Sequence, residues 1–109
     1  MKTNLDAPVT NRAGRRMNEG TAEAPGPEAT IGSLILQILD TPIAADMQAG
    51  LDRRLATARL GRKLGAATGE IEFDSSETTL ILERAAAQPL MSVVFEQLVE
   101  ATDPARWKV

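Results

Sequence analysis

The stretch PLMSVVFEQLVEA, residues 89–101, decides the fold class of this chain. Its apolar side chains recur at intervals of three and four residues, the spacing of one face of an α-helix. They are Leu90, Met91, Val94, Phe95, Leu98, Val99 and Ala101. At 100° per residue they cover about half of the helix circumference. We therefore expect this helix to be the central one of an all-α fold, with Phe95 in its core.

Two further helices are predicted from their end signals. Thr30 suits an N-cap, and the apolar periodicity from Ile31 to Leu39 stops before Pro42, which disfavours helical dihedrals in the residue ahead of it. Asp74 followed by Glu77 has the spacing of a capping box, so a helix begins there and runs to about residue 87.

The helix expected over residues 45–67 has apolar residues on two roughly opposite sides. Met47, Leu51, Leu55 and Ala58 share one side, and Ala56, Leu60, Leu64 and Ala67 share the other. The helix either breaks near Ala58–Gly61, since Gly61 and Gly65 each weaken a helix by about 1 kcal/mol, or it stays straight and is covered on both sides. The second possibility needs another layer, such as a second subunit, and predicts a homo-oligomer.

The rest of the chain is expected to lack regular structure. Residues 70–73 alternate polar and apolar side chains like a strand, but four residues without a partner make no sheet, so we expect an extended connector. Residues 1–29 contain three prolines and only isolated apolar side chains, too few to offset the entropy of ordering. The expected organisation is a disordered N-terminal arm and linker (1–29), a small four-helix array (30–103) and a C-terminal tail (104–109).

The composition argues against catalysis. The chain contains no cysteine and no histidine, which removes thiol nucleophiles, the usual general base near neutral pH and most transition-metal ligands. The acidic cluster Glu70, Glu72, Asp74 and Glu77 lacks the ligand spacing of a calcium loop. We therefore expect a protein that is not an enzyme and holds no cofactor and no metal.

The net charge of −3 hides a strong asymmetry. Residues 46–63 contain five basic and two acidic side chains, whereas residues 70–103 contain one basic and eight acidic ones. The basic segment could contact phosphates, but the acidic helix that follows it would repel nucleic acid, so nucleic acid is not the expected partner. We expect the basic helix to dock on the acidic half of its own fold or of a neighbour.

A protein partner is therefore the main expectation. No apolar run approaches the roughly 20 residues that span a bilayer, and the N-terminus lacks the apolar core of a signal peptide. The candidate interface residues are Leu60 and Leu64, the tail residue Trp107, and the arm cluster Arg12, Arg15 and Arg16. Trp107 is chosen because aromatic residues lead interface hot spots, and the arginines because the arm is expected to order on a partner.

The core also resembles a group of short proteins encoded by tailed bacteriophages and prophages. The matching pattern comprises Thr30-Ile31-Gly32-Ser33-Leu34, the stop at Thr41-Pro42, Leu60-Gly61-Arg62-Lys63-Leu64, Ile71-Glu72-Phe73, the run from Glu77 to Arg84, and a last helix ending at Asp103-Pro104. The resemblance carries no known activity. It implies a phage assembly or minor structural component, located in the host cytoplasm or the virion. The alternatives are a small acidic inhibitor of a host protein and, third, a DNA-binding regulator.

Overall fold

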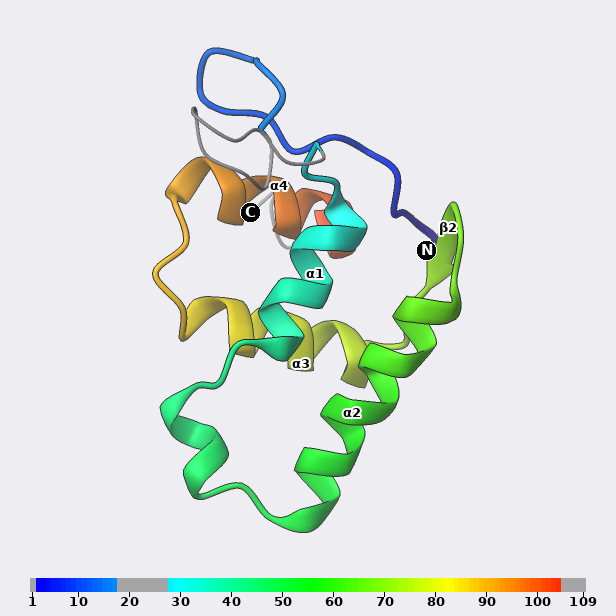
Figure 1. Cartoon of the computed structure of the whole chain (residues 1–109), viewed down its shortest axis with the longest axis vertical. Coiled ribbons are helices and arrows are strands. Elements are labelled where there is room, and N and C mark those ends of the chain that lie inside the picture. The colour runs from blue at the N-terminus through cyan, green and yellow to red at the C-terminus, as the bar shows by residue number, and fades with distance from the viewer. Residues whose placement is uncertain (1, 18–27, 105–109) are drawn as a thin grey trace.

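The computed structural model describes residues 2–17 and 28–104 of the chain. The elements are β1 (Lys2–Asn4), α1 (Ile31–Asp40), the 3₁₀ helix η1 (Ala44–Met47), α2 (Leu51–Ala66), β2 (Glu70–Glu72), α3 (Ser75–Ala86) and α4 (Ser92–Thr102) (Figure 1). A mostly helical fold is therefore confirmed. The fold is not purely helical, because β1 and β2 form a small sheet.

Helix α1 lies in the middle of the molecule, with α2 on one side and α3 crossing it (Figure 1). It begins as predicted: the Thr30 hydroxyl accepts a hydrogen bond from the Ser33 amide, and the Ser33 hydroxyl accepts one from the Thr30 amide. Ile35 and Ile38 are completely buried. Helix α1 is thus as central to the core as the predicted centre, α4.

Helix α4 buries a narrower face than its sequence pattern predicts. Val94, Leu98 and Val99 are buried, and Leu98 is inaccessible to solvent. Phe95 is only half-buried against the core, and Met91 is 56% exposed. The expectation that Phe95 is a core residue is therefore wrong in part, and Leu98 takes the innermost position of this helix.

The region predicted as one helix over residues 45–67 is divided near its start, not near Gly61. The 3₁₀ helix η1 ends at Met47, and α2 then runs without a break from Leu51 to Ala66. Of the two alternatives, a break near Gly61 is therefore wrong and a straight helix over this part is confirmed.

The connector expected at residues 70–73 has a partner strand. β1 pairs antiparallel with β2, so that Thr3 lies opposite Ile71. Both residues are buried, and the Thr3 hydroxyl donates a hydrogen bond to the Ala101 carbonyl at the end of α4. The prediction of an unpaired connector failed because the partner strand lies in the segment that was expected to be disordered.

Residues 2–17 belong to the fold, which corrects the expectation of a disordered arm over this range. Leu5 and Val9 are buried in the core. The Gly32 amide donates to the Leu5 carbonyl at 2.9 Å, and a Cβ at Gly32 would lie only 3.1 Å from Leu5 Cβ and O. The segment therefore reaches α1 through a contact that a glycine permits. The part of the expected arm at residues 18–27 lies outside the described residues.

Further hydrogen bonds join this segment to the residues before α1 and to α4. The Val9 amide donates to the Ala29 carbonyl, the Ala29 amide to the Met17 carbonyl, and the Met17 amide to the Val9 carbonyl. The Gln97 side chain spans the Thr10 backbone, since its Oε1 accepts from the amide at 2.9 Å and its Nε2 donates to the carbonyl at 2.7 Å. One side chain of α4 thus satisfies both backbone polar groups of Thr10.

Arg84 on α3 joins three elements from inside the molecule. Its side chain is 3% exposed and pairs with Asp46 of η1 at 2.6 Å, and it donates to the Thr41 carbonyl at 2.8 Å. Hydrogen bonding to the guanidinium of Arg84, then to the amide of Ile43, lowers the pKa of Asp46 to about 2. A buried charged group must be paired in this way, and the pairing fixes η1 beside the end of α1.

Candidate protein-binding surface

The outward side of α2 is apolar and uncovered. Leu60 and Leu64 point into the core and are each 3% exposed. At 100° per residue, Leu51, Leu55 and Ala58 lie on the opposite side of the helix. Leu51 is 72% exposed and Leu55 is 39% exposed. We call these three residues the α2 outer face.

Three arginines frame the α2 outer face. Arg62 continues it by one turn, and Arg54 and Arg59 flank it on either side of the helix. All three are exposed. Arg54 interacts electrostatically with Asp46 of η1, whereas Arg59 and Arg62 form no side-chain hydrogen bond or ion pair with a residue in the described part of the chain. This charge is available to a partner.

The other basic side chains of α2 are engaged with α3. Lys63 pairs with Glu77 at 2.8 Å, and Arg53 pairs with Glu83 at 3.1 Å. The Lys63 ammonium also donates to the Glu72 carbonyl at 3.0 Å. The expected docking of the basic helix on the acidic half of its own fold is therefore confirmed for these two residues. The ion pairs and the buried leucines hold α2 from one side and leave the other uncovered.

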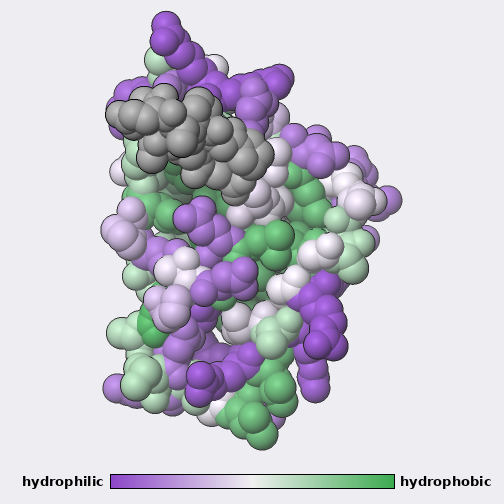
Figure 2. All heavy atoms as spheres, viewed as in Figure 1, coloured by the Kyte–Doolittle hydropathy of each residue, from purple (hydrophilic) through white to green (hydrophobic). Residues whose placement is uncertain are grey.

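η1 adds apolar surface near the start of α2. Met47 is 90% exposed, next to Asp46, whose side chain pairs with the buried Arg84. A shallow groove lined by Met47, Ile43 and Arg54 joins η1 to α2. Figure 2 shows apolar residues gathered at this end of the molecule, where η1 and α2 begin.

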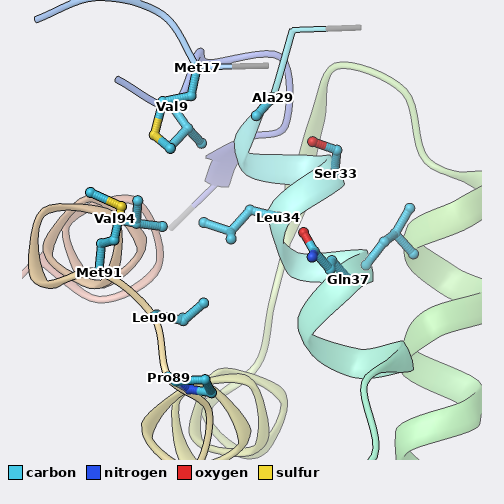
Figure 3. Close-up of a pocket in the computed structure, with 11 residues that line it drawn as sticks. Val9, Met17, Ala29, Ser33, Leu34, Gln37, Pro89, Leu90, Met91 and Val94 are labelled. Atoms are coloured by element: carbon cyan, nitrogen blue, oxygen red, sulfur yellow. The ribbon is translucent and has the colours of Figure 1, made fainter. Parts of the chain in front are cut away.

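A cavity of about 620 Å³ lies between the N-terminal segment, α1 and α4 (Figure 3). Its apolar walls include Val9, Met17, Leu34, Leu90, Met91 and Val94, and its polar lining residues are Ser33 and Gln37. The Ser33 hydroxyl is already used in the N-cap of α1. None of the lining residues is ionisable, so the cavity offers apolar contact and no acid–base chemistry.

The structure separates the sequence-predicted site residues. Leu60 and Leu64 are each 3% exposed and belong to the core of this chain, so the prediction that they form an interface is wrong for this fold. Trp107 lies outside the described residues. Leu51 and Leu55, which the sequence placed on the other apolar side of the same helix, are the exposed leucines. Helical spacing alone did not indicate which side packs inward.

Arg12, Arg15 and Arg16 are all exposed. They belong to the turn at residues 10–16, which is closed by the bridge between Thr10 and Arg16 and projects from the body of the molecule (Figure 1). The Asn11 side chain accepts hydrogen bonds from the Ala13 and Arg15 amides, which holds the turn in shape. Arg16 pairs with Glu28 at 3.2 Å. The turn presents an exposed basic surface that is separate from α2.

No group of metal-ligating side chains gathers anywhere in residues 2–17 and 28–104. Over the same residues, no helix is both long enough and apolar enough to cross a bilayer. Comparison with family models, with curated proteins and with solved structures finds no match to this chain.

Proposed function

We propose that this chain is a non-catalytic protein–protein interaction module that binds its partner through the α2 outer face. The exposure of Leu51 and Leu55 on an otherwise well-fastened helix carries the proposal. Removing apolar surface from water contributes about 25 cal/mol per Å², so a partner that covers these leucines gains affinity without rearranging the chain. Met47 on η1 extends the surface that such a partner can cover.

The way α2 is held supports this role. Leu60 and Leu64 bury its inner side, and Lys63 and Arg53 tie it to α3. A contact surface that is already ordered loses little conformational entropy on binding. The three exposed arginines add charge selectivity, because charged groups at the rim of an interface steer association and disfavour partners of like charge.

Within this class, we propose a phage assembly or minor structural component, in the host cytoplasm or the virion, on the basis of the resemblance to short phage proteins. The basic turn at residues 10–16 provides a second contact. The alternative, an acidic inhibitor that covers a basic site, has less support. Asp74, Glu77 and Glu83 have partners within the fold, which reduces the acidic surface open to a host protein.

A site-specific photo-crosslinker tests the proposal. It is placed at Ala58 on the α2 outer face and, as a control, at the exposed Thr68 beyond the end of the helix. We expect a discrete protein adduct in native host cells from position 58 only. The double substitution Leu51→Gln, Leu55→Gln should abolish the adduct while circular dichroism stays unchanged, since both side chains contact solvent. An adduct that survives this substitution, or no adduct from position 58, would overturn the proposal.

A further inference from the structure

We propose that the partner of the α2 outer face is a second copy of this chain, which receives it in the groove between its own α3 and α4. The copies would then associate head to tail. The inference rests on the proposed function and names its partner. It follows from two complementary surfaces on one molecule: the protruding α2 outer face, which is flanked by basic residues, and the groove between α3 and α4, which has acidic residues at its edge.

The receiving groove is apolar and has an acidic rim. It has a volume of about 650 Å³, and its walls include Ala85, Leu90, Phe95 and Val99. Phe95 and Leu90 are only half-buried, so both present apolar surface to the groove. A ridge of leucines on a helix fits such a groove between two helices, which is the usual mode of helix-in-groove recognition.

The charges on the rims are complementary. Glu96 lines the groove, and Glu100 lies one turn further along the same side of α4; both are exposed. With a rise of 1.5 Å per residue, these carboxylates are about 6 Å apart along the axis. Arg59 and Arg62 are about 4.5 Å apart along α2 by the same measure. Two arginine–carboxylate pairs can therefore form while the leucines enter the groove.

The two surfaces cannot meet within one molecule. Leu60 and Leu64 hold the inner side of α2 against the core, so the outer face points away from the fold. A symmetric contact between two parallel α2 outer faces is disfavoured, because it would place Arg54, Arg59 and Arg62 of one copy against the same residues of the other. A head-to-tail contact leaves a free face and a free groove at the ends, so it grows into a chain or closes into a ring.

Sedimentation velocity of the full chain, with mixing of two variants, tests the inference. The face variant carries Leu51→Gln and Leu55→Gln. The groove variant carries Ala86→Arg, because Ala86 is an exposed groove residue and an arginine there blocks entry without opening a cavity. The wild type should grow beyond a dimer as its concentration rises. Each variant alone should be monomeric, and an equimolar mixture should give a discrete dimer, since one keeps the groove and the other keeps the face.

A charge exchange provides an independent readout. Arg59→Glu should weaken self-association by at least about tenfold, and adding Glu96→Arg should restore it. Circular dichroism confirms that each variant is folded. A wild type that stays monomeric from about 1 µM to 1 mM would overturn the inference, as would a groove variant that still associates. In either case, a crosslinked adduct with a different protein at position 58 would leave the proposed function standing, whereas loss of that adduct would refute both.

Discussion

Replacing Arg84 with methionine tests whether the buried ion pair organises this fold. Arg84 pairs with Asp46 and donates to the carbonyls of Thr41 and Leu39. Methionine keeps much of the volume of the side chain and removes its charge and all its donors. The substitution leaves Asp46 without its cation, so we expect a large loss of stability.

The size of the loss follows from the burial of the two partners. Removing one partner of a buried ion pair costs about 3–5 kcal/mol. We expect about 3 kcal/mol, the lower end of this range, because the Asp46 side chain is 25% exposed and can regain water, whereas Arg84 is 3% exposed. A domain of this size has a free energy of unfolding of about 5–15 kcal/mol, so the variant should remain folded but melt earlier.

Urea unfolding at pH 7, followed by far-ultraviolet circular dichroism, measures the effect. Arg53→Met is the matched control, since it also removes the cation of one ion pair, in this case with Glu83. That pair lies at the surface, with the Arg53 side chain 45% exposed and the Glu83 side chain 53% exposed. Exposed pairs contribute about 1 kcal/mol or less, so the control should unfold close to the wild type. Equal losses in Arg84→Met and Arg53→Met would refute the reasoning.

The double variant Arg84→Met, Asp46→Leu separates the pair from its isolated charge. If the loss arises mainly from a carboxylate left without its cation, replacing both residues by apolar ones should recover part of the stability. No recovery would indicate that the hydrogen bonds of Arg84 to Thr41 and Leu39 matter more than the charge of Asp46.

Three further predictions concern the core, the acidic range of pH and the N-terminal segment. Leu98→Ala should lower the free energy of unfolding by about 3–5 kcal/mol, because Leu98 is completely buried. Phe95→Ala should lower it clearly less, since Phe95 is half-buried. Urea unfolding that ranks the two variants in the opposite order would contradict the core assignment. The pKa of Asp46 in the fold, about 2, lies below its ordinary value of 3.8. The contribution of the Asp46 carboxylate to stability should therefore be complete above about pH 4 and disappear as the pH falls towards 2. Asp46→Asn should lose less stability than the wild type over this pH window, and an equal loss would exclude the effect. Gly32→Ala should push Leu5 away from α1, because the added Cβ would lie 3.1 Å from Leu5. Amide hydrogen exchange should then become faster at Leu5 and Thr3. In the control Gly61→Ala, the added Cβ meets nothing within 4 Å, so exchange at these amides should be unchanged or slower.

The sequence by itself determined the features that depend on near neighbours in the chain. The caps at Thr30 and at Asp74 with Glu77 are decided within four residues, and the structure contains both. The mostly helical class and the end of α1 near Pro42 also follow from local patterns. The same reasoning identified two apolar sides on α2, since helical spacing is a property of the sequence alone.

Only the tertiary structure decided which of those sides is buried. Leu60 and Leu51 carry equal apolar character, and α1 and α3 cover the side that includes Leu60. The choice of Leu60 and Leu64 as interface residues failed for this reason, because both are buried in the core. Periodicity shows that two faces exist, whereas burial depends on which elements arrive from elsewhere in the chain.

The N-terminal segment and Arg84 show the same limit. Leu5 and Val9 appear isolated along the sequence, yet they enter a core built by helices far along the chain. Arg84 appears as one cation among acids, and its partner Asp46 comes from another element. These contacts join residues distant in sequence, so no local pattern encodes them, and the packed fold alone provides the burial that makes them strong.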